Sequence, residues 1–241
     1  MKCTLISYTG IGHSDPMYAA KLLAFTKNTR MNLTPDGIND FMKKPNEEIL
    51  SELSYMATSI PSSWEFVDVI FSVNDISRAT AQQMTRTRTA SYAMQSQRVT
   101  NMHDVTWDKR GFPLDPMMEQ AIDNYSSLVE IGESLEDARN ILPVGVHCNL
   151  LCKYNLRSFV ELVRARDSLR VQGEYHDIVL AMKGAVLEVW PWAAVFFVRK
   201  QAIAIRLLEE VAVEIGKLQG EQGAMYKGIS GKLAKAADLL K

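Results

Sequence analysis

The sequence predicts an α+β protein in which helices dominate over strands. Three short runs are rich in β-branched and aromatic residues, as strands are. The longer segments between them combine helical spacing of apolar residues with capping residues. The chain has 241 residues, 47% of them hydrophobic, which is enough to bury a core in one large domain with an appendage. The chain contains no internal repeat and no low-complexity linker.

Strands are expected at residues 4–8, 66–73 and 144–154, and the first is followed by a glycine-containing loop at residues 10–12. Helices are expected to begin at Pro35, Pro45, Asp115, Ser134, Asn155 and about Val171. Asp115 and Pro116 have the order of an N-cap followed by proline at the first helical position, and this helix should run toward Ile131. The helix after Asn155 carries one apolar stripe, formed by Leu156, Phe159, Val160 and Val163.

The charge balance and the cysteines exclude several classes of protein. The formal net charge is −1, so no global charge points to nucleic acid or to an anionic membrane. The three cysteines, Cys3, Cys148 and Cys152, are too few and too unevenly spaced for a disulfide framework or a zinc site, and we interpret them as buried structural thiols. The most apolar stretch, residues 178–198, contains Lys183, Glu188 and Pro191, which argues against a membrane span. A cytoplasmic protein without a signal peptide or a metal is the expectation.

Arginines gather in residues 76–98, a segment with four arginines and no acidic residue. If the segment is helical, Arg78, Gln82 and Arg86 share one face. A solvated helix face normally mixes both signs of charge, and arginine donates paired hydrogen bonds to phosphate oxygens. The segment therefore suits a bound polyanion. The alternative is that these arginines pair with acids from elsewhere, such as Glu47, Glu48 or Asp75.

A second arginine set follows at residues 155–170. Arg157, Glu161 and Arg164 have the spacing of an ordinary surface ion-pair lattice. Arg166 and Arg170 lie one turn apart, so they could face a ligand together. The residues of this segment do not by themselves decide between the two interpretations.

The two arginine sets resemble the flavin-dependent thymidylate synthase (ThyX) family. That family has an Arg-His-Arg signature followed by seven residues and Ser, and this sequence aligns with it at Arg86, Thr87, Arg88 and Ser96. Further blocks match in order, from a Ser62 and Glu65 element to the segment around Arg166. The matching residues are Ser77-Arg78-Ala79, Gln83, Ala90-Ser91-Tyr92, Gln95-Ser96 with Arg98, Glu136 to Arg139 with Leu142-Pro143, Asn155-Leu156-Arg157-Ser158, Arg166 and Gln172.

The resemblance implies a helix-rich domain with a central, mainly antiparallel sheet at residues 1–195. The residues after it lie mostly outside the resemblance, and their pattern predicts a helical C-terminal extension at residues 196–241 that carries a lysine-bearing tail. The resemblance further implies a homotetramer with shared active sites that binds no nucleic acid. It also implies methylation of dUMP to dTMP, with FAD as cofactor, methylenetetrahydrofolate as carbon donor and NADPH as reductant.

The resemblance also assigns roles to single residues. The cofactor-binding residues would be Ser62, Arg86, Arg88, Asn155, Leu156 and Arg157. The substrate-binding residues would be Gln83, Gln95, Ser96, Arg98, Arg139 and Arg166. Arg166 would also be catalytic, because it would face the pyrimidine ring and stabilise negative charge at the N3–O edge of uracil.

The sequence departs from the family at several histidine positions. Thr87 replaces the signature histidine, and Ile60, Phe66 and Arg170 stand where the family has other histidines; Glu161 replaces a position that commonly bears an amide. Three alternatives therefore stay open beside the leading one. They are methylation or hydroxymethylation of another pyrimidine nucleotide such as UMP or dCMP, a non-catalytic nucleotide-binding paralogue, and binding of RNA or DNA through the arginine helix.

Overall fold

The computed structural model describes residues 1–27, 34–59, 61–166 and 173–198, together with positions 208, 210, 211, 229 and 231–233. The chain divides into two compact units, Met1–Ala193 and Ala194–Lys241. In the second unit, α9 (Ala194–Phe197) is a short helix. Most of the predicted C-terminal extension and its lysine tail lie outside the described residues. No helix within the described ranges is long and apolar enough to cross a membrane.

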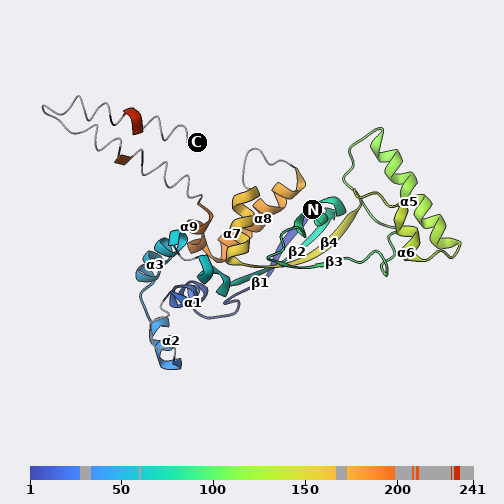
Figure 1. Ribbon diagram of the computed structural model, residues 1–241. Coiled ribbons are helices and arrows are strands. Elements are labelled where there is room, and N and C mark those ends of the chain that lie inside the picture. The colour runs from blue at the N-terminus through green and yellow to red at the C-terminus, as the bar shows by residue number, and fades with distance from the viewer. Residues whose placement is uncertain are drawn as a thin grey trace. The chain divides into compact units, whose positions relative to one another are not determined.

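The first unit is an α+β fold built on one four-stranded sheet (Figure 1). Its elements in chain order are β1 (Lys2–Tyr8), α1 (Tyr18–Thr26), α2 (Pro35–Met42), α3 (Asn46–Ser59), η1 (Pro61–Phe66), β2 (Asp68–Ser77), α4 (Arg78–Met84), β3 (Ser91–Met94), α5 (Leu114–Glu130), α6 (Leu135–Ala138), η2 (Arg139–Ile141), β4 (His147–Asn155), α7 (Leu156–Arg166), α8 (Glu174–Val189) and η3 (Pro191–Ala193). The strands lie in the order β1-β2-β4-β3, and every neighbouring pair is antiparallel. The predicted fold class is confirmed.

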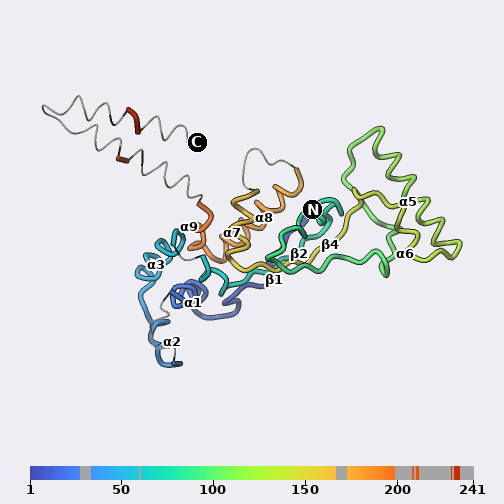
Figure 2. Tube along the Cα trace, viewed as in Figure 1, coloured from blue at the N-terminus to red at the C-terminus, as the bar shows by residue number. Residues whose placement is uncertain are grey.

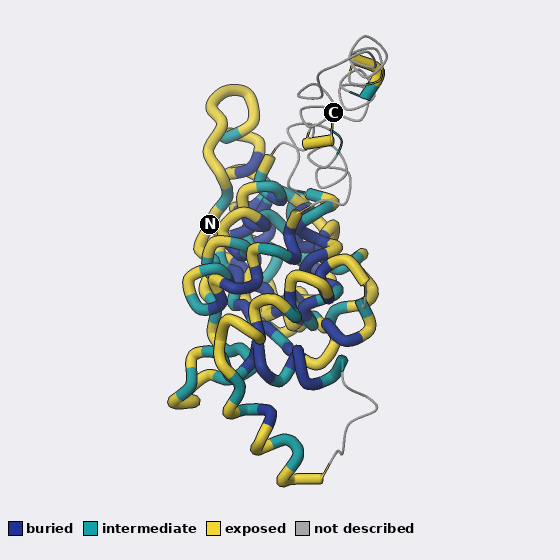
Figure 3. The backbone as a smooth tube through the Cα atoms, turned by 90° about the vertical axis from the view of Figure 1, so that its left-hand side faces the viewer, coloured by how far each residue is buried: buried dark blue, intermediate teal, exposed yellow. Residues whose placement is uncertain are grey.

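One face of the sheet is covered by α7 and α8. Strands β2 and β4 lie side by side although they are far apart in the sequence (Figure 2). Alternate residues of β2, among them Phe71, are buried, while those of β4 between Asn149 and Lys153 alternate between exposed and buried. Phe71 and Tyr154 both pack against Phe159 of α7, with ring centroids 5.6 and 5.9 Å apart. The apolar stripe predicted for this helix is buried against the sheet. Figure 3 shows the buried stretches gathered inside the fold, with exposed ones around them.

The α5–α6 region packs through small apolar clusters of its own. Met102, Tyr125 and Ala138 form one cluster, and Met118, Ile122 and Val146 form another. The buried Tyr125 hydroxyl accepts a hydrogen bond from the Met102 N–H at 3.1 Å. These contacts join α5 and α6 to the loop that follows β3.

Several predicted boundaries were wrong. The arginine segment is not one helix, because α4 ends at Met84 and leaves Arg86 in a loop, and β3 follows at Ser91. Helix α5 begins at Leu114, before the predicted cap. The carboxylate of Asp115 instead accepts hydrogen bonds from the N–H groups of Arg110 and Gly111 and so closes the preceding loop. Phe66 belongs to η1 rather than to β2, and α1 was not predicted.

Candidate functional site

The loop at residues 85–90 lies against the first turn of α7. It begins where α4 ends, and it carries Arg86, Thr87 and Arg88. The Ser158 hydroxyl donates a hydrogen bond to the Thr89 carbonyl oxygen at 2.9 Å. This contact brings together two segments that are distant in the sequence and that the family resemblance assigns to one cofactor.

The start of α4 is held by a carboxylate from α8. The side chain of Ser77 caps α4 by accepting from the Thr80 N–H at 3.1 Å. Glu174 accepts from the Ser77 N–H at 2.9 Å and from the Ser77 hydroxyl at 2.6 Å. The N-terminal ends of α4 and α8 are therefore tied together through one acidic side chain, which orients the loop that α4 leads into.

The first turn of α7 presents the predicted cofactor residues in different ways. The Asn155 side-chain oxygen accepts from the Ser158 N–H at 2.9 Å, which is the predicted capping contact. Leu156 is fully buried, and its N–H donates to the Val67 carbonyl oxygen at 2.8 Å. Leu156 therefore serves the core, and these contacts give its predicted role at the cofactor no support.

Arg157 joins α7 to η1. Its guanidinium lies 2.8 Å from Glu65 and 3.3 Å from Glu161. Hydrogen bonds that Arg157 donates to Glu65 and Glu161 raise its pKa, so the group stays charged. Ser62 is exposed in the same short helix as Glu65. The ion pair of Arg157 with Glu161 agrees with the surface lattice that the sequence suggested. The guanidinium carbon of Arg164 lies over the Trp64 ring, 5.7 Å from its centre.

Arg86 and Arg88 are exposed, and within the described ranges neither has a carboxylate within 4 Å. The alternative pairing with acids of α3 did not occur, since Glu48 pairs with Lys44 instead. Gln83 is exposed near the end of α4, one turn before these arginines. The loop that carries these two exposed arginines contacts the first turn of α7 through the Thr89 carbonyl oxygen.

Of the predicted nucleotide residues, Gln83 lies before β3 in α4 and Arg166 ends α7. The other four, Gln95, Ser96, Arg98 and Arg139, follow β3 in the chain. The Gln95 side-chain oxygen accepts from the Asn149 N–H at 3.0 Å, and the Ser96 hydroxyl accepts from the Arg98 N–H at 3.2 Å. Arg98 and Arg139 then meet at one carboxylate. Glu136 lies 3.1 Å from the Arg98 Nε atom and 3.6 Å from the Arg139 guanidinium. The fold thus brings these two arginines to one place, where their joint charge suits an anion.

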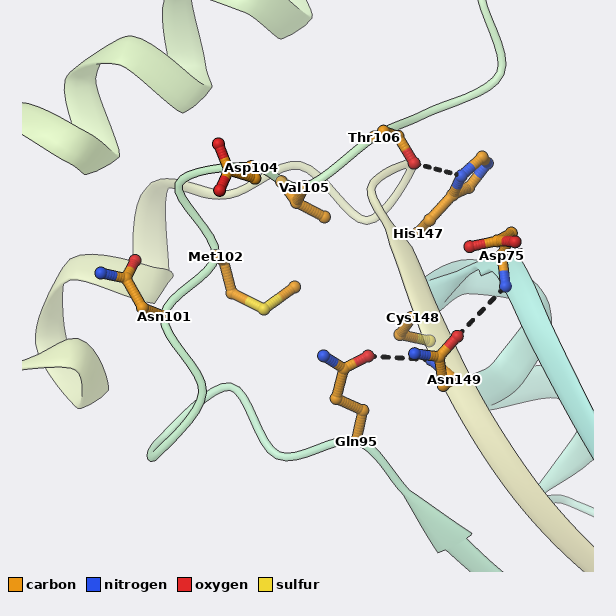
Figure 4. Close-up of a pocket in the computed structure, with 10 residues that line it drawn as sticks. All are labelled: Asp75, Gln95, Asn101, Met102, Asp104, Val105, Thr106, His147, Cys148 and Asn149. Carbon is orange, nitrogen blue, oxygen red and sulfur yellow. Dashed lines mark hydrogen bonds between the residues drawn. The ribbon is translucent and has the colours of Figure 1, made fainter.

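A cavity of about 200 Å³ opens beside Gln95 (Figure 4). Hydrogen bonds join its polar walls. The Asn149 side-chain oxygen accepts from the Asp75 N–H at 3.2 Å, and the His147 Nδ1 atom lies 2.9 Å from the Thr106 hydroxyl oxygen. The cavity is smaller than typical ligand pockets, which measure about 300–1,000 Å³. Neither Arg98 nor Arg139 lines it. It borders the predicted nucleotide set without enclosing it.

Arg166 closes α7 and lies over the ring of Tyr175, with the guanidinium carbon 4.7 Å from the ring centre. Sequence reasoning missed Tyr175, because an aromatic residue inside a helical pattern is ordinary core. Ile60, Arg170 and Gln172, which belong to the family comparison, lie outside the described residues.

The cysteines behave as structural thiols. Cys148 and Cys152 are buried, and none of the three cysteines is oxidised. Burial raises the pKa of Cys3 to about 11 and that of Cys152 to about 12, which disfavours a reactive thiolate. In the part of the chain that the structure describes, no group of three or more potential ligands could hold a metal ion.

The sequence of this chain matches a known family over most of its length. The family described as "Thymidylate synthase complementing protein" matches residues 4–192. A flavin-dependent thymidylate synthase from Saccharolobus solfataricus is 29% identical over 78% of this chain and 73% of its own length. Another from Sulfurisphaera tokodaii is 25% identical over 95% of this chain and 94% of its own.

A solved structure shares the fold. Thymidylate synthase X from Helicobacter pylori, crystallised with FAD and dUMP, superposes with a TM-score of 0.66 at 16% identity. The superposition covers 83% of this chain and all of that one. Because the family match extends over residues 4–192, the chain belongs to the thymidylate synthase complementing protein family, which confirms the resemblance found in the two arginine sets.

Proposed function

We propose that the protein is a flavin-dependent thymidylate synthase that methylates dUMP to dTMP with methylenetetrahydrofolate as carbon donor and NADPH as reductant. The observation that carries the proposal is the hydrogen bond between Ser158 and the Thr89 carbonyl oxygen. It brings the loop with Arg86 and Arg88 onto the helix that ends at Arg166. The names of the relatives support the same activity.

The residues around that contact fit a flavin dinucleotide. The pyrophosphate of FAD needs cations, and Arg86 and Arg88 have no carboxylate partner within 4 Å among the described residues. Ser62, Asn155 and Arg157 add a hydroxyl, an amide and a third guanidinium from η1 and α7. Bound FAD would supply the redox chemistry, while the protein binds, orients and polarises.

The residues beyond β3 suit a nucleotide monophosphate. Arg98 and Arg139 would hold the phosphate, because the fold brings both guanidinium groups to one place, where the phosphate would displace the Glu136 carboxylate that they share. Gln83, Gln95 and Ser96 would bind the sugar and the base through neutral hydrogen-bonding groups. Arg166 would face the uracil N3–O edge and stabilise the negative charge that develops there, which is electrostatic catalysis by a positioned donor.

The layout supports the proposal that subunits share active sites. Arg86 and Arg88 precede β3, and four of the nucleotide residues, Gln95, Ser96, Arg98 and Arg139, follow it, so the strand separates these groups along the chain. A homotetramer in which neighbouring chains complete each site would bring them together. The outward-facing Leu151 of β4, 42% exposed, offers apolar surface for such packing.

The test of the proposed function is spectroscopic and catalytic. The purified protein, with FAD added, is expected to show bound-flavin absorbance, to sediment as a tetramer and to release tritium from C5-labelled dUMP when given methylenetetrahydrofolate and NADPH. Parallel assays with UMP and dCMP show which pyrimidine nucleotide is the substrate. A colourless protein that binds dUMP without turnover would establish the non-catalytic alternative, and tight oligonucleotide binding with steep salt dependence would establish nucleic-acid binding.

Glu161 provides a second test, because its carboxylate competes for the guanidinium of Arg157. The change Glu161→Gln keeps a hydrogen-bond acceptor and removes the charge. We expect FAD to bind roughly two- to fivefold more tightly to this variant, as measured by flavin fluorescence titration. The matched control is Glu119→Gln, which removes an acid 3.6 Å from Lys109 near α5. If the parent and Glu161→Gln bind FAD with equal affinity, Arg157 is not a residue that binds FAD.

A further inference from the structure

The guanidinium of Arg166 is held by an aromatic ring rather than by an acid. Its carbon lies 4.7 Å from the ring centre of Tyr175, a residue in the first turn of α8 that is only 5% exposed. Among the described residues, no carboxylate lies within 4 Å of Arg166. Arg157, Arg98 and Arg139 each have such a partner. Arg166 is thus packed without being neutralised.

The hydroxyl of Tyr175 lies near the loop at residues 85–90. Thr87 and Arg166 both approach this hydroxyl; burial raises the pKa of Tyr175, and the two neighbours offset part of that rise. Neither contact is aligned as a full hydrogen bond among the described residues. Thr87 also contacts the hydroxyl of Tyr92, whose pKa is raised by burial and lowered in part by Tyr154 and Thr87.

The row of hydroxyls continues into the core. The hydroxyls of Tyr92 and Tyr154 lie 3.0 Å apart, and their rings meet edge to face with centroids 5.9 Å apart. Tyr154 is fully buried in β4. Burial raises the pKa of this tyrosine as well, so the row consists of neutral dipoles.

We propose that Tyr175 is a positioning residue for Arg166, whose guanidinium lies over its ring. The inference rests on the proposed function, because it concerns how Arg166 meets a nucleotide. A ring under a guanidinium restrains its plane through a cation–π contact and leaves its N–H donors available. A carboxylate in the same place would consume both the charge and the donors. The pair thus pre-orders a long side chain that would otherwise lose rotamer freedom on binding.

The experiment measures dUMP binding to the FAD-loaded protein by calorimetry. The change Tyr175→Met removes the ring at similar volume, and Tyr175→Phe removes only the hydroxyl. We expect Tyr175→Met to weaken dUMP binding about tenfold, which corresponds to about 1.4 kcal/mol, and Tyr175→Phe to bind nearly as the parent does. Tyr8→Leu is the matched control, since Tyr8 makes an aromatic contact with Trp190 and none with Arg166. It should bind dUMP as the parent does.

A double-mutant cycle separates positioning from general damage to the fold. In an Arg166→Ala background, Tyr175→Met should cause no further loss of dUMP binding, because the residue it positions is gone. Additive losses, or a Tyr175→Met protein that binds like the parent, would overturn the proposal. If Tyr175→Met does not fold, Tyr175→Leu replaces it in the cycle and should weaken binding to a similar extent only when Arg166 is present. A parent protein that binds no dUMP at all would instead refute the proposed function.

Discussion

Replacing Arg166 by lysine is expected to lower kcat/KM for dUMP methylation by about 10²–10³-fold, the loss typical of one well-placed electrostatic donor. Lysine keeps the charge but lacks the planar fork that can meet the N3–O edge of uracil with two donors. It also lacks the planar guanidinium that contacts the ring of Tyr175. The loss should fall on kcat more than on KM, because the charge develops in the transition state.

Tritium release from C5-labelled dUMP measures this effect directly. Flavin absorbance of Arg166→Lys should stay like that of the parent, since Arg86 and Arg88 hold the cofactor in the proposed site. Arg110→Gln is the control, because Arg110 is an exposed arginine in the loop before α5. If Arg166→Lys turns over at the parent's rate, Arg166 is not the catalytic group, even if the protein binds FAD and dUMP.

Replacing Asp15 by asparagine is expected to lower the free energy of unfolding by about 2 kcal/mol at neutral pH. The Asp15 carboxylate lies 2.9 Å from the Lys21 ammonium, whose side chain is only 9% exposed. Removing one partner of a fully buried pair costs about 3–5 kcal/mol, because the other charge is left without compensation. The expected value is lower here because Asp15 itself is 30% exposed and water can screen the lysine.

The effect of Asp15→Asn should depend on pH. Burial raises the pKa of Asp15, but the hydrogen bond from Lys21 and that from the Met17 N–H outweigh it, so the net pKa lies below the ordinary value. A carboxyl with a lowered folded-state pKa stabilises the fold above its unfolded pKa of about 3.9 and loses that contribution as pH falls through the folded value. Urea unfolding should therefore show the difference between parent and variant at pH 7, and this difference should shrink below about pH 4.

A matched control exists for this pair. Asp40 lies at the same 2.9 Å from Lys43, but both side chains are 75% exposed. Asp40→Asn should change the free energy of unfolding by no more than about 0.5 kcal/mol, as exposed pairs do. Equal effects of the two substitutions would show that burial of Lys21 is not what makes its partner necessary.

The secondary structure was predictable where apolar periodicity was strong. The stripe of Leu156, Phe159, Val160 and Val163 and the β2 strand were found because both bury one face and so leave a pattern in the sequence. Strand β3 was missed, because its four residues show partial burial only and lie in a segment with helical spacing of polar residues. Helix α1 was missed because it is apolar on most sides, with six of its nine residues buried, which obscures the period.

The candidate site was predictable as a set of residues but not as an arrangement. The arginines could be assigned to a cofactor and a nucleotide from their order along the chain. That order does not show that Arg98 and Arg139 converge on Glu136, or that Glu65 pairs with Arg157. Nor does it show Tyr175 beneath Arg166, since helical spacing describes a residue's own helix and not what packs against it.

By itself, the sequence determined the fold class, the family and the residues available for the chemistry, because these follow from local pattern and from the order of residues along the chain. Only the tertiary structure decided which guanidinium groups are neutralised and which keep their donors for a ligand. The ion pair of Arg157 with Glu65 and the hydrogen bond of Ser158 with Thr89 both join residues that are distant in the sequence and that folding brings together. Electrostatic attraction and hydrogen bonding act over a few ångströms in space, whatever the separation along the chain.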